Sequence, residues 1–184
     1  MKKIVIGLTG QTGAGKSTVF KLLLGLYTPQ SGSVLIEGVP AADIADQDRR
    51  ALFGYVEQRF HQVPGTVRDQ ITLYDPAISD QAVRTAAKLA GLSDTIESLP
   101  QGYDTPCTPE LFSQGQWQLL SIARAAAADP RILLLDEITA NLDAETENAV
   151  LQALKRVSAN RTVISISHRT GTQTGRVIPI EPAH

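Results

Sequence analysis

The 184-residue sequence contains one cysteine and few aromatic residues, which make up 5% of the chain. A single cysteine, Cys107, excludes an internal disulfide and fits a reducing compartment. No apolar run approaches the ~20 residues that a membrane-spanning helix needs, and Met1 leads into a predicted strand rather than a cleavable signal. The net charge of −2 gives no electrostatic footprint for nucleic acid or an anionic membrane. The composition therefore indicates a cytosolic globular protein, with no nucleic-acid partner expected.

Short apolar strands alternate with helical patterns, which predicts an α/β fold with a mainly parallel sheet. The predicted strands are residues 4–8, 33–36, 53–56, 132–135, 163–167 and 176–180. Ser79 and Gly91 enclose one predicted helix, and Asp143 begins another with an acidic first turn and a basic end. Between about residues 60 and 128 no run resembles a strand. We therefore expect one domain, residues 1–184, with a helical lobe inserted between two strands.

The segment GQTGAGKST matches the pattern G-x-x-x-x-G-K-[ST], in which the backbone N–H groups of a loop wrap the phosphates of a nucleotide. An apolar β-branched run precedes the segment and a helical pattern follows it, as the strand–loop–helix arrangement requires. We therefore expect a nucleoside triphosphate to bind here. The binding residues would be Gly10, Gln11, Thr12, Gly13, Ala14, Gly15, Lys16, Ser17 and Thr18.

The second candidate motif is the apolar run ILLLDE, which ends in Asp136 and Glu137. A buried strand of this kind ends at the carboxyl edge of the sheet, where open α/β sheets bind their ligands. Asp136 is placed there to hold Mg²⁺, with Ser17 as a hydroxyl ligand. Glu137 is placed to accept a proton from an attacking water. Without the phosphate loop, such an acidic pair would be equally consistent with a capped turn.

The stretch LFSQGQWQLLSIARAAAADPRILLLDEITANLD resembles the segment from the signature motif to the D-loop of ATP-binding cassette (ABC) ATPases. Residues 112–116 correspond to the family's L-S-G-G-Q, and GYVEQ supplies Gln58 at the position of the Q-loop. SISHR supplies His168 at the position of the switch histidine. These motifs follow the family's order across residues 10–169, and LPQGYDT and PGTVRDQI are most similar to the exporter branch.

This resemblance implies a P-loop NTPase with a RecA-like core that binds ATP with Mg²⁺ and hydrolyses it. It implies that Gln58 joins Ser17 and Asp136 in organising the metal. It also implies that Glu137 is the general base, while His168 positions the γ-phosphate and the water. A separate membrane-spanning transporter subunit or domain is the expected partner, with this chain cytoplasmic or peripheral at the inner face of the membrane.

The signature residues are implied to act on a second chain. Ser113 is a good N-cap for the helix that follows, and Gly115 leaves backbone N–H groups open at the positive end of that helix. By resemblance, Ser113, Gly115 and Gln116 cap the γ-phosphate held by the loop of a partner. Two chains in a head-to-tail pair would then enclose two ATP molecules.

The sequence departs from the family pattern in several places. Met1 lies close before Gly10, so the family's N-terminal strands, which carry an aromatic residue that stacks on adenine, are expected to be missing. Gln114 replaces a glycine of the signature, and CTPEL stands where exporters have a glutamate-containing loop. Trp117 occupies a position where exporters carry arginine, and we expect it to pack or contact a partner. Tyr55 is expected to be a core or edge aromatic.

The opening MKKIVIGLTGQTGAGKSTV is also similar to small P-loop kinases such as dephospho-coenzyme A kinases. Phosphoryl transfer to a small molecule is therefore an alternative, and so is an ATP-binding module that does not serve transport. The kinase alternative leaves the SQGQ, LDE and SHR motifs unexplained. Turnover that depends strictly on a hydroxyl acceptor would identify a kinase, and nucleotide binding without phosphate release would identify a binding module.

Overall fold

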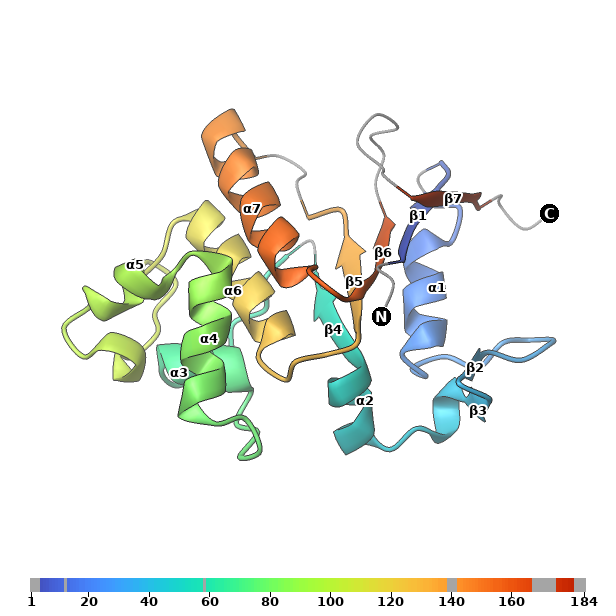
Figure 1. Ribbon diagram of the computed structural model, residues 1–184, viewed down its shortest axis with the longest axis horizontal. Coiled ribbons are helices and arrows are strands. Elements are labelled where there is room, and N and C mark those ends of the chain that lie inside the picture. The colour runs from blue at the N-terminus through green and yellow to red at the C-terminus, as the bar shows by residue number, and fades with distance from the viewer. Residues whose placement is uncertain (1–3, 12, 58, 139–141, 167–174, 181–184) are drawn as a thin grey trace.

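The computed structural model describes residues 4–11, 13–57, 59–138, 142–166 and 175–180 (Figure 1). Within these ranges, a five-stranded sheet has the order β4-β5-β6-β1-β7. Its strands are β4 (Phe53–Val56), β5 (Ile132–Asp136), β6 (Thr162–Ile166), β1 (Val5–Thr9) and β7 (Arg176–Pro179). Each neighbouring pair is parallel, which confirms the predicted α/β fold with a parallel sheet.

Helices cover both faces of the sheet, as the alternation of side chains along β5 shows. Leu133 and Leu135 belong to a large buried cluster with α6 (Gln114–Ala126) and α7 (Ala144–Val157). Leu134, between them, belongs to a smaller cluster around Phe20 of α1 (Lys16–Leu23). Because both faces of β5 are covered, its sequence is a continuous apolar run rather than an alternating one.

The segment between β4 and β5 is helical. It contains α3 (Val67–Thr72), α4 (Asp80–Ala90), α5 (Ser93–Glu97), the 3-10 helix η2 (Gly102–Asp104) and α6. These helices lie together at the left of Figure 1, where α7 packs against α4 and α6. Among the helices that the structure describes, none is long and apolar enough to cross a membrane.

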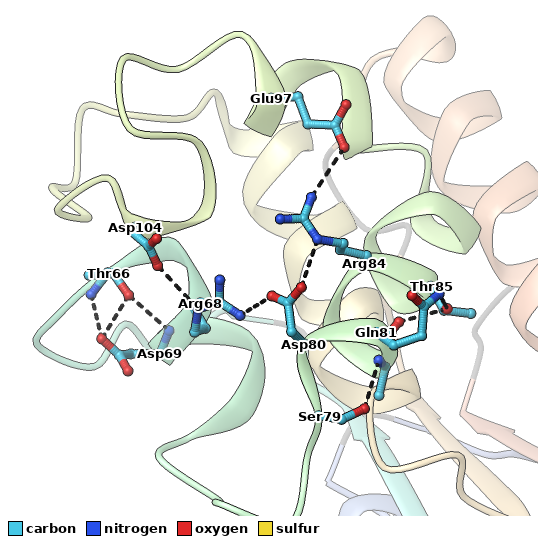
Figure 2. A network of polar contacts seen from close by, with 11 residues as sticks. Thr66, Arg68, Asp69, Ser79, Asp80, Gln81, Arg84, Thr85, Glu97 and Asp104 are labelled. Atoms are coloured by element: carbon cyan, nitrogen blue, oxygen red, sulfur yellow. Dashed lines mark hydrogen bonds and ion pairs between the residues drawn. The ribbon is translucent and has the colours of Figure 1, made fainter.

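An exposed network of charged side chains links α3, α4, α5 and η2 (Figure 2). Arg68 contacts Asp80, and its Nε donates to Asp104 Oδ1 at 3.1 Å. Arg84 Nε donates to Asp80 Oδ2 at 2.8 Å, and Arg84 Nη1 lies 3.7 Å from Glu97 Oε1. Hydrogen bonds from Arg68 and then Arg84 hold the pKa of Asp80 below its usual value. Because solvent screens exposed ion pairs, this network contributes more to helix placement than to stability.

The segment before β4 differs from the prediction. Only Leu35–Ile36 of the strand predicted at residues 33–36 forms a strand (β2), and it pairs antiparallel with β3 (Val39–Pro40) in a separate sheet. The chain then forms η1 (Ala41–Asp43) and α2 (Asp46–Leu52). Helix α2 is not predicted from the sequence, because it buries no residue and therefore has no apolar stripe to recognise.

Candidate nucleotide-binding site

The phosphate loop joins β1 to α1, as the strand–loop–helix pattern predicts. Gly15, the residue before α1, has φ of 91°, in the left-handed region that glycine adopts without steric cost. The start of α1 has no side-chain cap hydrogen bond. The first N–H groups of α1 therefore receive no acceptor from a capping side chain among the described residues, and the positive end of the helix lies at the loop.

The Lys16 side chain turns back into the loop. Its Nζ donates to the carbonyl oxygens of Gly10 at 2.9 Å and Gln11 at 2.8 Å, and the residue is only 5% exposed. Inside the loop, Ala14 N–H donates to the Gln11 carbonyl at 3.1 Å. Because these two acceptors are neutral carbonyls, they do not compensate the charge of the ammonium, which attracts anions to the loop.

The acidic pair lies at the carboxyl edge of the sheet. Asp136 is the last residue of β5, and it lies opposite Ile166, the last residue of β6. Glu137 has φ of 47°, which is uncommon for a residue other than glycine, and its N–H donates to the Ile166 carbonyl at 3.2 Å. Backbone strain of this kind persists where the surrounding structure enforces it, and it clusters at functional sites.

Two hydroxyl groups hold the Asp136 carboxylate. Tyr55 of β4 donates from its hydroxyl to Asp136 Oδ2 at 3.1 Å, and the Ser17 hydroxyl is also hydrogen-bonded to this carboxylate. Burial raises the pKa of Asp136, while the bonds from Tyr55 and Ser17 act in the opposite direction. Burial, together with the charge of Asp136, raises the pKa of Tyr55, so the Tyr55 hydroxyl keeps its proton and remains a donor.

The loop and the acidic pair line one open cavity of about 380 Å³. Its lining residues are Gly13, Gly15, Lys16, Ser17, Thr18, Asp136 and Glu137. A Cβ added at Gly13 or Gly15 would meet no atom within 4 Å, so the loop backbone can approach a ligand closely. The structure therefore brings together the two motifs that lie far apart in the sequence.

The donors around this cavity suit a triphosphate with Mg²⁺. Loop amides and an ammonium match phosphate oxygens, and Mg²⁺ prefers one or two carboxylates completed by phosphate oxygens and water. Among the described residues, no group of three or more His, Cys, Asp and Glu side chains could form a metal site made of protein alone. An ion shared between Asp136 and a nucleotide is consistent with this arrangement.

The signature residues lie at the start of α6. Ser113 Oγ accepts from Gln116 N–H at 3.3 Å, and Gln116 Oε1 accepts from Ser113 N–H at 2.9 Å, which is a reciprocal capping box. Gly115 lies against α7, and a Cβ there would be 2.4 Å from Thr146 Cγ2. None of the three signature residues lines the cavity at the loop, and Figure 1 shows α6 and α1 at opposite sides of the sheet.

Three predicted site residues, Thr12, Gln58 and His168, lie outside the described residues, and their roles stay predictions. The prediction that the strand before His168 runs beside the acidic strand is confirmed, because β6 pairs with β5. Trp117 packs, as expected: its ring lies 5.0 Å from that of Phe60 and 5.2 Å from that of Phe112, between centroids.

Tyr55 is the site residue that the sequence does not reveal. It pairs with Leu134 in the β4–β5 register, so its side chain shares a face with Leu134 and with Asp136 two residues later. That register joins strands far apart in the chain, and no local pattern in the sequence specifies it.

A parallel sheet with a glycine-rich loop between β1 and α1, and an acidic pair after β5, defines a P-loop nucleotide-binding domain. The ABC transporter family matches residues 2–140, and the chain belongs to this family. ABC transporter ATP-binding proteins are ATPases.

Individual relatives agree with the family match. The putative ABC transporter ATP-binding protein exp8 of Streptococcus pneumoniae is 41% identical over 169 residues, which cover 91% of this chain and 29% of the relative. The alpha-hemolysin translocation ATP-binding protein HlyB of Escherichia coli O157:H7 is 41% identical over 170 residues, which cover 91% of this chain and 24% of the relative.

A solved structure of a bacterial Atm1-family ABC exporter with ATP bound matches with a TM-score of 0.80 and 36% identity, over 97% of this chain and 32% of that chain. The predicted ABC fold and exporter-like character are thereby confirmed. The chain spans about a quarter to a third of the length of these proteins.

Proposed function

We propose that this chain binds ATP with Mg²⁺ and hydrolyses it as the ATP-binding domain of an exporter-like ABC transporter. The cavity shared by the phosphate loop and the acidic pair carries the proposal. There, the positive end of α1 and the buried Lys16 ammonium suit the phosphates, while the Asp136 carboxylate suits a divalent cation.

The proposed roles follow from the positions around the cavity. The loop amides and Lys16 hold the phosphates, and Ser17 and Asp136 hold the metal. When bound, Mg²⁺ neutralises charge on the phosphate oxygens. Glu137 is the general base for the attacking water. The resemblance adds Gln58 at the metal and His168 at the γ-phosphate.

Release of phosphate from ATP without an added acceptor tests the proposal. We expect the purified chain to release phosphate with Mg²⁺, and we expect Lys16→Ala to abolish this while the exposed control Lys88→Ala retains it. A strict requirement for a hydroxyl acceptor would instead identify a kinase. Binding of ATP with no phosphate release would identify a module without hydrolysis.

We further propose that two chains pair head to tail, with the signature of each completing the cavity of the other. The separation of Ser113, Gly115 and Gln116 from the cavity of their own chain supports this arrangement. In the proposed pair, each nucleotide lies between the loop of one chain and the start of α6 of the other.

Mixing two inactive variants tests the pairing. Lys16→Ala disables the loop, and Ser113→Arg disables the signature. In a mixed pair, one of the two sites keeps both wild-type halves, so we expect partial recovery of ATPase activity. If mixed pairs demonstrably form and activity stays absent, the signature does not act on the partner's site.

The length of the relatives supports a membrane-spanning partner. Because the chain spans only a quarter to a third of these proteins, we propose that a separate subunit, or the remainder of a longer chain, converts hydrolysis into transport. This domain would then lie at the cytoplasmic face of the membrane. We expect it to sediment with inverted membrane vesicles from its source cells and not with protein-free phospholipid vesicles. Equal behaviour with both would contradict the proposal.

A further inference from the structure

Tyr55 reaches the acidic pair from the neighbouring strand. It lies opposite Leu134 in the β4–β5 register, so its side chain is on the face of the sheet that also carries Asp136. The hydroxyl donates to Asp136 Oδ2 at 3.1 Å. Tyr55 therefore contacts the proposed metal ligand without lining the cavity itself.

The ring of Tyr55 is held by the helix that follows the phosphate loop. Phe20 of α1 is fully buried and meets the Tyr55 ring edge to face, with centroids 5.9 Å apart and planes at 87°. Phe20 lies about one helical turn after Lys16. Tyr55 thus connects the start of α1 to the carboxylate at the end of β5.

We propose that Tyr55 is a positioning residue that orients the Asp136 carboxylate toward a divalent cation. This inference rests on the proposed function, because it assumes that Asp136 holds the metal of a bound nucleotide. A carboxylate offers about four lone-pair directions on its two oxygens. The Tyr55 bond uses one of them and fixes the rotation of the group, and the others remain for Ser17 and the cavity.

Tyr55→Phe removes this hydroxyl and keeps the ring that packs on Phe20. Loss of an outer partner of a metal ligand typically costs 10–100-fold in metal affinity, so we expect half-maximal Mg²⁺-dependent ATP binding to require roughly 10–100-fold more Mg²⁺. ATP binding measured in EDTA should be unchanged, and saturating Mg²⁺ should restore most of kcat. Tyr27→Phe, which removes the hydroxyl of an exposed tyrosine away from the cavity, is the matched control and should behave as wild type.

A second variant tests whether Tyr55 affects the Mg²⁺ requirement through Asp136. In an Asp136→Asn background, adding Tyr55→Phe should cause no further change in the Mg²⁺ requirement. An unchanged Mg²⁺ requirement in the single Tyr55→Phe variant would overturn the inference. Equal losses of ATP affinity with Mg²⁺ and in EDTA would also overturn the inference, because they would show that the Tyr55 hydroxyl contributes only to packing. If wild-type binding and hydrolysis need no Mg²⁺ at all, the proposed function fails instead.

Discussion

Helices α1 and α6 both begin at a motif associated with phosphate, but their first turns differ. Within the described part of the chain, no side-chain cap closes the start of α1, where Gly15 lines the cavity. At α6, Ser113 and Gln116 already satisfy each other in a capping box. The start of α1 is therefore organised to receive an anion, whereas the start of α6 is stable without one. This difference agrees with the proposal that the start of α1 binds phosphate in its own chain and that the signature acts on the nucleotide of a partner chain.

The largest effect is expected beside α1, at Glu137. Removal of a general base typically costs 10²–10⁴-fold, so Glu137→Gln should lose roughly that much ATPase activity and keep its ATP affinity. The same substitution at Glu97, in the exposed network of the helical segment, should leave turnover unchanged. Single-turnover hydrolysis and equilibrium ATP binding provide the two readouts. Near-normal hydrolysis by Glu137→Gln would remove it as the base.

At α6 we expect a steric effect from Gly115. A Cβ at this position would overlap Thr146 Cγ2, and overpacking of this kind typically costs about 1–3 kcal/mol. Gly115→Ala should therefore lower the free energy of unfolding. Thr146→Ser removes Cγ2 but keeps the hydroxyl, so the double variant should recover most of the loss.

A double-mutant cycle of denaturant unfolding measures this coupling between Gly115 and Thr146. If the two substitutions lower the free energy of unfolding additively, contact with Thr146 of α7 is not the reason that residue 115 must be glycine. If the double variant regains stability but not ATPase activity, Gly115 is also needed for the proposed contact with the nucleotide of the partner chain.

A smaller effect distinguishes the two roles of Ser113. Loss of a serine N-cap typically costs about 1 kcal/mol, so Ser113→Ala and Ser79→Ala, which uncap α6 and α4, should lower thermal stability similarly. Only Ser113→Ala should also lower ATPase activity at saturating ATP. Equal activity in the two variants would mean that Ser113 serves solely as a cap.

The smallest effect is expected in the network of Figure 2, which contains no residue of either motif. Because the pKa of Asp80 is lowered by Arg68, its contribution to stability is fully present above the unfolded-state pKa and is lost as pH falls through the folded-state pKa. Asp80→Asn should therefore slightly lower the midpoint of thermal unfolding near neutral pH. The difference from wild type should begin to shrink below about pH 4 and vanish only below the lowered folded-state pKa, and added salt should reduce it. A pH-independent difference would assign the effect to something other than this charge.

Patterns contained in short stretches of sequence made the phosphate loop and the acidic strand predictable. Glycine spacing located Gly15, and a continuous apolar run located Asp136 at the end of a buried strand. The contacts of Tyr55 and Thr146 could not be predicted, since they depend on the β4–β5 register and on the packing of α6 against α7. The strand expected at residues 33–36 became part of a hairpin because its partner is the nearby β3 rather than the central sheet.

The ATPase rate per chain, measured over a series of chain concentrations, tests most directly whether the loop at α1 and the signature at α6 complete one another's sites. Sedimentation with ATP present should define the range in which pairs form. We predict that the rate per chain rises through this range and then levels off. A rate per chain that stays constant from the monomeric to the paired state would contradict a shared site.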